Sequence, residues 1–208
     1  MISRLNKRPL VRVYHQGCEA NLPDEKNKKI WKKISNQVIR IGTWNVRTLN
    51  DDFDYKLSKL LSEMKRLKIN ILGIAETHWT KEVEESFEEN GHVIIHSSRR
   101  DNIHRQGVAF VLTKDIAQYM SDYELISERM MSITLDFDNG PLTLFQVYAP
   151  DTSYNEVEIE LFNEQLQERV NLIPKKTKQI ILGDFNAKIG HEAYINWSQV
   201  AGRFSMGD

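Results

Sequence analysis

Residues 180–186 read Ile-Ile-Leu-Gly-Asp-Phe-Asn, and they carry the strongest structural signal in the chain. The apolar run predicts a buried strand that stops at Gly183. Asp184 and Asn186 follow at a spacing of two, which places their side chains on the same side of an extended backbone. An acid and an amide at a strand end suit metal-assisted or water-orienting chemistry. The alternative is an ordinary turn after a strand, because Asp and Asn both favour turns.

The same arrangement recurs elsewhere along the chain. Apolar runs at residues 38–43, 69–75 and 142–147 each lead towards a residue that can bind a metal or a phosphate. In α/β folds, functional groups collect beyond the carboxyl ends of strands. We therefore expect four side chains to converge at one rim and to hold a cation and an anionic ester together: Asn45, Glu76, Tyr148 and Asp184.

The sequence predicts two long helices. In residues 54–68 the apolar residues recur at helical spacing and form one stripe, and Asp54 is the predicted cap. The second helix covers about residues 155–172, with a capping box formed by Ser153 and Glu156 at its start.

Further strands are predicted between and after these helices, at residues 92–96, 107–112, 130–137 and 179–182. The sequence Asp-Asn-Gly at 138–140 predicts a hairpin turn, because Asn-Gly readily supplies positive φ. Residues 81–90 read as an acidic, exposed loop or short helix. Strands paired by a hairpin, mixed with strands that follow helices, predict an α/β fold with a mixed sheet or with two sheets covered by helices.

Length and charge indicate one domain with a basic leader. The 208 residues suffice for one well-buried domain, which we place at residues 38–208. Residues 1–40 hold ten Lys or Arg and three Asp or Glu, although the whole chain has a net charge of −1. Residues 1–37 are expected to be a disordered leader, either without a partner or in contact with nucleic acid phosphates.

The sequence also bears on the compartment. Cys18 is the single cysteine, which excludes an intrachain disulfide and fits a reducing environment. The first residues have no apolar core of the secretory type, and no apolar run approaches the ~20 residues that cross a bilayer. We expect an intracellular protein, nuclear or cytoplasmic, with no membrane partner.

Four motifs in order carry a family resemblance: Thr43-Trp44-Asn45, Ile74-Ala75-Glu76-Thr77, Val147-Tyr148-Ala149-Pro150 and Gly183-Asp184-Phe185-Asn186. The set resembles the endonuclease/exonuclease/phosphatase superfamily over residues 38–190. It looks closest to the craniofacial development protein 2-like branch, which is related to LINE-type retrotransposon endonuclease domains. The resemblance implies a four-layer sandwich of two mixed β-sheets flanked by helices. It also implies hydrolysis of phosphodiesters, DNA first among them, with Mg²⁺ or Mn²⁺ and no other small-molecule cofactor.

The resemblance also implies a role for each matching residue. Glu76 is the metal ligand, and Asn45 beside it helps to fix the metal or a phosphate oxygen. Tyr148 donates its hydroxyl to the scissile phosphate. Asp184 orients and deprotonates the attacking water, and Asn186 holds the developing phosphorane or the Asp184 side chain.

Structural interpretations of the same residues stay open. Glu76 could be an exposed acid at a strand end, Asn45 a turn residue, and Tyr148 a core aromatic with its tip at the surface. Trp44 is expected to pack in the core rather than to stack on a base. His78 is expected to be a bystander near the site.

The sequence departs from the family pattern at two places. Arg47 stands where branches that act on abasic sites carry an acid, which argues against abasic-site repair. The family closes with a Ser-Asp-His-type motif, but the only histidine after Asp184 is His191. We therefore expect the C-terminal part of the domain to be missing, with open sheet edges and weak or no hydrolysis.

Two other functions follow from these departures. One is a non-catalytic relic that binds nucleic acid or a protein. The other is a phosphatase or deadenylase of the same superfamily.

Overall fold

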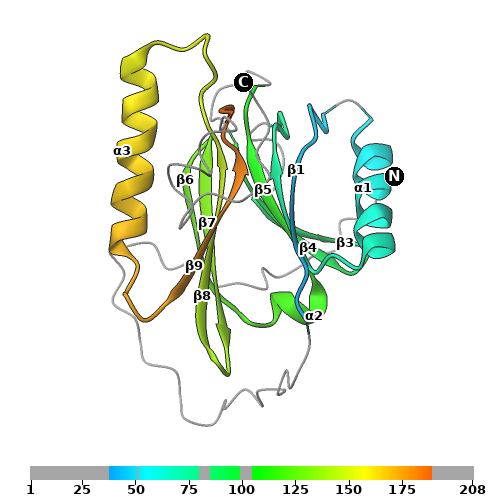
Figure 1. The fold of residues 1–208 in the computed structure, drawn as a ribbon. Coiled ribbons are helices and arrows are strands. Elements are labelled where there is room, and N and C mark those ends of the chain that lie inside the picture. Colours follow the sequence, from blue (N-terminus) through cyan, green and yellow to red (C-terminus); the bar gives the residue numbers. More distant parts are fainter. Residues whose placement is uncertain (1–37, 51, 80–84, 99–104, 189–208) are drawn as a thin grey trace.

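Two β-sheets lie face to face in the computed structural model, and one long helix covers the outer side of each (Figure 1). The structure describes residues 38–50, 52–79, 85–98 and 105–188. The predicted leader at 1–37 and His191 lie outside these ranges. The four-layer sandwich of two mixed sheets is confirmed.

The first sheet has the order β1-β2-β5-β4-β3. Its strands β1 and β2 are parallel and its other pairs are antiparallel. The strands are β1 (Ile41–Asn45), β2 (Ile71–Ala75), β3 (Ser86–Glu89), β4 (His92–Ser97) and β5 (Val108–Thr113). Every residue of β2 is buried, as the mostly apolar run at 69–75 predicts for a strand covered on both faces.

The second sheet has the order β6-β7-β8-β9, with β8 and β9 parallel. Its strands are β6 (Met120–Ser127), β7 (Met130–Phe137), β8 (Gly140–Tyr148) and β9 (Lys178–Asp184), and the short helix α2 (Lys114–Ala117) precedes them. The predicted hairpin at 138–140 joins β7 to β8, and Gly140 has φ of 104°. The second sheet is therefore mixed as well, as the combination of a hairpin with a strand that follows a helix predicts.

Three apolar clusters join the layers. The largest lies between the sheets and includes Ile71, Phe110, Ile133 and Leu144. Helix α1 (Phe53–Leu67) packs its apolar stripe on the outer face of the first sheet, through Leu57, Leu60, Leu61 and Met64. Helix α3 (Glu156–Leu172) covers the second sheet through Phe162, which packs with Phe145 and Val147. Within the described residues, no helix has the length and apolar character needed to cross a membrane.

The predicted helix caps were wrong by two residues in each helix. The residue before α1 is Asp52, in the left-handed region at φ 51°, and its side chain makes no capping hydrogen bond. The capping box of α3 pairs Asn155 with Glu158. Ser153 instead bonds Asp151 in the preceding turn. Both segments hold several residues that favour caps, so local sequence does not choose between them.

Two strands were not predicted. Strand β3 lies inside the acidic stretch 81–90, of which residues 81–84 are outside the description. Strand β6 has polar residues at several positions and is mostly half-exposed. Both are edge strands paired on one side only within the described residues, so neither needs a continuous apolar run.

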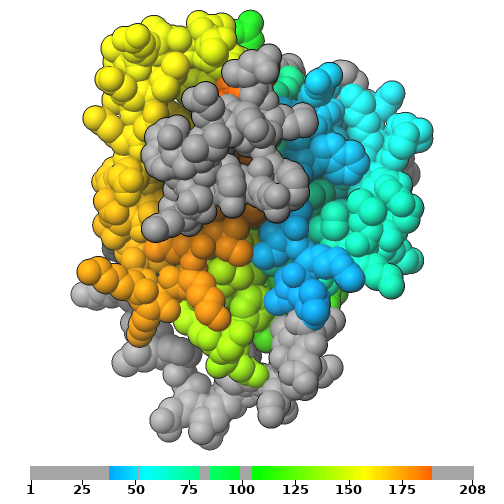
Figure 2. Space-filling view, in the orientation of Figure 1, coloured from blue at the N-terminus to red at the C-terminus, as the bar shows by residue number. Residues whose placement is uncertain are grey.

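The edges β1 and β9 of the two sheets lie against each other. In the space-filling view, the β1 segment (blue) and the β9 segment (orange) both reach the front face (Figure 2). Ile180 and Ile181 are 37% and 38% exposed, and Trp44 is 44% exposed. The predictions that 180–182 is buried and that Trp44 packs in the core were therefore wrong. In the described part of the chain, β1 pairs only with β2 and β9 only with β8, so one side of each strand has no hydrogen-bonded partner strand.

Candidate active site

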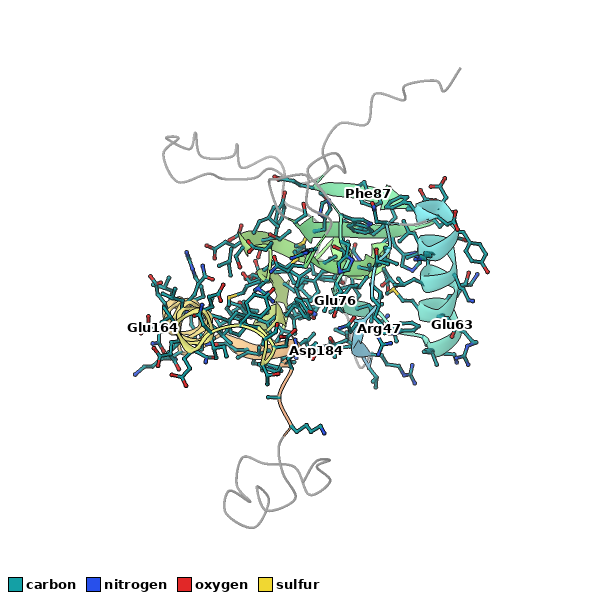
Figure 3. All side chains as sticks on the ribbon, turned by 90° about the horizontal axis from the view of Figure 1, so that it is seen from above. Arg47, Glu63, Glu76, Phe87, Glu164 and Asp184 are labelled. Carbon is teal, nitrogen blue, oxygen red and sulfur yellow. The ribbon has the colours of Figure 1, made fainter. Side chains whose placement is uncertain are left out.

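The topology brings the ends of four strands to one rim. Strands β1 and β2 are parallel and in register at Asn45 and Ala75, so Glu76 follows directly beside Asn45. Strands β8 and β9 are parallel and in register at Tyr148 and Asp184. Seen from above, Glu76 and Asp184 lie near the seam between the two halves (Figure 3). All four predicted side chains thus reach the same place.

Asn45 is the link between the two sheets. Its Nδ2 donates to Glu76 Oε1 at 2.6 Å and to Asp184 Oδ2 at 2.9 Å. Its Oδ1 accepts from the backbone N–H of Arg47 at 3.0 Å, which fixes the orientation of the amide. One neutral side chain therefore holds two carboxylates together.

Glu76 stands in an unusual backbone conformation. Its φ is 60°, a left-handed value that costs a non-glycine residue free energy and is common at functional sites. Its carbonyl accepts from Thr48 N at 2.8 Å, so the segment after β1 helps to hold it. Its Oε2 lies 3.7 Å from His78 Nε2. His78 was expected to be a bystander, yet it contacts the predicted metal ligand.

Tyr148 presents its hydroxyl to Glu76. Burial raises the pKa of Tyr148 to about 12, and the hydrogen bond to the Glu76 carboxylate and its charge act in the same direction. A hydrogen bond with Asn186 acts in the opposite direction. The phenol is therefore neutral at physiological pH and keeps its proton to donate.

Asp184 and Asn186 are arranged differently from the prediction. Strand β9 ends at Asp184, and Asn186 has φ of 47°, so the backbone turns instead of continuing extended. The backbone N–H of Asn186 donates to Asp184 Oδ1 at 2.9 Å, and its side-chain amide donates to Ala149 O at 2.7 Å. Asp184 is thereby held at both carboxylate oxygens.

The donor set fits a hard cation that keeps most of its water. Glu76 and Asp184 share one hydrogen-bond donor, so two carboxylates lie close together at the rim. Mg²⁺ is bound in this way, by one or two carboxylates and substrate phosphate. Within the described ranges no group of three His, Cys, Asp or Glu side chains could hold an ion. Asn45 turns its NH₂ group towards both carboxylates and so fixes their relative position.

Sequence reasoning missed Arg129 and a cavity beside the rim. The guanidinium of Arg129 lies against the Tyr148 ring, 5.1 Å from its centroid. Arg129 also lines a cavity of about 840 Å³, with residues of the loop 150–154 and of α3. No local pattern marks Arg129, because the contact depends on how β7 and β8 pair.

Comparisons with known proteins agree with this architecture. The chain matches the Endonuclease/Exonuclease/phosphatase family over residues 42–204. It is 35% identical over 167 residues to craniofacial development protein 2 of Bos taurus, which covers 80% of this chain and 27% of that protein. The chain thus spans about a quarter of the length of that curated relative.

Two solved structures share the fold at low sequence identity. One is the endonuclease domain of TRAS1, a telomere-specific non-LTR retrotransposon, with a TM-score of 0.52, 19% identity, and coverage of 72% of this chain and 61% of that chain. The other is D. rerio TDP2 complexed with single strand DNA product, with a TM-score of 0.55, 14% identity, and coverage of 76% and 64%. The family match and the 35% identical relative, rather than these structures, confirm the predicted family resemblance.

Proposed function

Because the chain belongs to the endonuclease/exonuclease/phosphatase family, we propose that it is a phosphodiester hydrolase that acts on nucleic acid with a divalent cation. The observation that carries this proposal is the amide of Asn45, which holds Glu76 and Asp184 together across two sheets. One relative in fold is a retrotransposon endonuclease domain and another holds a single-stranded DNA product, so DNA is the first substrate to test.

Glu76 is the residue that would hold the cation. Its Oε1 is fixed by Asn45, and its Oε2 lies on the side of His78. Mg²⁺ or Mn²⁺ bound there supplies Lewis-acid stabilisation of the charge on the phosphate. The branch related to craniofacial development protein 2, with a retroelement origin, is the one the sequence favours.

Tyr148 and Asp184 perform the remaining steps. The neutral phenol of Tyr148 donates a hydrogen bond to a non-bridging phosphate oxygen, and its pKa of about 12 keeps that proton in place. Asp184 orients a water molecule and accepts its proton as the oxygen attacks phosphorus. The backbone N–H of Asn186 fixes the Asp184 carboxylate for this task.

Slow hydrolysis is expected from these 208 residues. The family pattern includes a histidine in a closing Ser-Asp-His-type motif, and the only histidine after Asp184 is His191, which lacks the preceding aspartate. Within these 208 residues that histidine is not present to protonate the leaving oxygen, which is the reason for the low expected rate.

Nicking of supercoiled plasmid by the full chain tests the proposal. The expected result is slow nicking that needs Mg²⁺ and disappears in Asp184→Asn, while Asn171→Ala on the exposed face of α3 serves as the control. Nicking that persists in EDTA or in Asp184→Asn contradicts the proposed site, and rapid nicking contradicts the expected rate.

Other outcomes of the same assay favour the alternative functions. Salt-dependent DNA binding without cleavage favours the non-catalytic relic. Hydrolysis of a phosphate monoester or of poly(A), with plasmid left intact, favours the phosphatase or deadenylase branch.

A further inference from the structure

Arg129 is a buried cation with no carboxylate within ion-pair distance among the described residues, although, beside the hydrogen bonds from Ser153, its charge helps to lower the pKa of Asp151. It lies between β6 and β7, and only 9% of its surface is exposed. Its guanidinium forms no ion pair in the described part of the chain, although burying a charge in this way is costly. The contacts around Arg129 offer an explanation for a buried charge at this position.

Two tyrosine rings contact the guanidinium. Arg129 Cζ lies 5.1 Å from the ring centroid of Tyr148 and 4.6 Å from that of Tyr154, both within the range of a cation–π contact. Tyr154 is itself held, because its hydroxyl accepts from Gln106 Nε2 at 3.4 Å. The Arg129 guanidinium therefore contacts both Tyr148 at the catalytic rim and Tyr154 in the loop that leads into α3.

Arg129 also forms two hydrogen bonds with the main chain of Tyr148. Its Nη1 donates to the Tyr148 carbonyl at 3.1 Å, and its own carbonyl accepts from Tyr148 N at 2.8 Å. Tyr148 follows the last β8 residue that pairs with β7, Val147 opposite Met130. The ring and the backbone of Tyr148 are thus both fixed by one residue.

The surroundings argue against direct contact between Arg129 and a substrate phosphate. Its Nη2 is buried and has no hydrogen-bond partner in the described ranges. The cavity that Arg129 lines is bordered by four glutamates and one further arginine: Glu128, Glu158, Glu164, Glu168 and Arg105. The excess of negative charge around this cavity repels a polyanion.

We propose that Arg129 is a positioning residue that holds Tyr148 at the rim through the contacts of its guanidinium with the rings of Tyr148 and Tyr154. The inference deepens the proposed function and rests on it, because it takes Tyr148 as the donor to the substrate phosphate. A planar guanidinium can stack on two rings and donate to a carbonyl at once, whereas an ammonium of equal charge has no plane to stack.

The first experiment follows the Tyr148 ring by NMR in the full chain with ¹³C-labelled tyrosine, its signals assigned with Tyr148→Phe. In Arg129→Met and in Arg129→Lys the Tyr148 signals should shift and broaden, while methyl signals from the cluster between the sheets stay unchanged. Tyr154→Leu removes one of the two ring contacts of Arg129, and it should shift and broaden the Tyr148 signals to a smaller extent. Arg66→Met, at an exposed ion pair on α1, is the matched control and should leave Tyr148 unchanged.

Two results of that experiment would overturn the proposal. Unchanged Tyr148 signals in both Arg129 variants would show that Arg129 does not hold the ring. Tyr148 signals in Arg129→Lys that match those of the wild type would show that the positive charge is sufficient and that the planar guanidinium is not needed.

The second experiment is a double-mutant cycle on binding. The probe is a short single-stranded DNA with phosphorothioate linkages, in the presence of Mg²⁺. Tyr148→Phe and Arg129→Met should each weaken binding about tenfold, the value of one hydrogen bond to a charged group, and the double variant should lose no more than either. Additive losses would show that Arg129 contacts the nucleic acid itself, which overturns the positioning role.

The two experiments separate the two proposals. If the wild-type chain does not bind the probe, the proposed function fails, and the NMR experiment still decides whether Arg129 holds Tyr148.

Discussion

The amide nitrogen of Asn45 lies 2.9 Å from Asp184 Oδ2, and this one hydrogen bond joins the rims of two different sheets. The two residues are 139 positions apart in the sequence. Because the same nitrogen also donates to Glu76, the relative position of the two carboxylates depends on Asn45. The bond therefore offers a direct test of the site.

Asn45→Ala should weaken the binding of Mn²⁺ or Mg²⁺ by about 10- to 100-fold, the usual loss when a residue that orients ligands is removed. Without the amide, the two carboxylates repel each other and move apart. Calorimetric titration with Mn²⁺ measures the change, and Asn171→Ala is the control. An unchanged affinity would show that Asn45 does not position the Glu76 carboxylate for the ion.

Gly183→Ala should destabilise the fold and displace Asp184. Gly183 has φ of 149°, and a Cβ there would lie 2.0 Å from the Val147 carbonyl oxygen, which belongs to the neighbouring strand β8. Relief requires the β8–β9 pairing to shift, at a cost of about 1–3 kcal/mol for the backbone strain alone. Urea unfolding measures the free energy of unfolding.

Gly91→Ala is the matched control for that variant. Gly91 also has a positive φ, 78°, but a Cβ there meets nothing within 4 Å. Gly91→Ala should therefore lower the free energy of unfolding by less than Gly183→Ala does. Equal losses would show that the contact between β8 and β9 is looser than described.

The stability of the metal-free protein should fall as the pH rises from about 10 to 12, in part through Tyr148. Its pKa is raised from the ordinary 10.0 to about 12 in the folded state, chiefly by burial. Below pH 10 the phenol is protonated in both states and this contribution is complete. Between the two pKa values only the unfolded state loses the proton, so unfolding becomes easier.

Tyr148→Phe removes that contribution. Urea unfolding in EDTA at pH values from 9 to 12 should give a shallower loss of stability for the variant than for the wild type. Parallel curves would indicate that Tyr148 titrates at its ordinary pKa.

Ile181→Lys should cost little stability and should reduce aggregation. Ile181 is 38% exposed on β9, where the described residues pair with one side only, and a charged residue on such an edge opposes pairing with another chain. Light scattering on heating measures aggregation.

The matched variant is Ile133→Ala, in the cluster between the sheets and fully buried. It should cost about 2–5 kcal/mol in urea unfolding. If Ile181→Lys is equally destabilising, then the exposed side of β9 is covered in solution.

The sequence predicted most elements because their signals are local. The stripe of α1, the Asp-Asn-Gly hairpin and the unbroken apolar run of β2 each lie within a few residues and follow the period of their structure. It missed β3 and β6 because edge strands need less apolar sequence, and it misplaced both caps because neighbouring residues competed for them. The family motifs also identified which strand ends matter.

The sequence by itself determined that Asn45, Glu76, Tyr148 and Asp184 follow apolar strands and that they belong to a known family pattern. Only the tertiary structure decided that one amide joins two carboxylates, that Trp44 and Ile181 are exposed, and that Arg129 contacts two tyrosine rings. The physical reason is that the spacing of apolar residues along the sequence indicates which face of a helix or strand is buried. The packing of distant segments decides which segments lie beside an edge strand and which groups contact a buried charge.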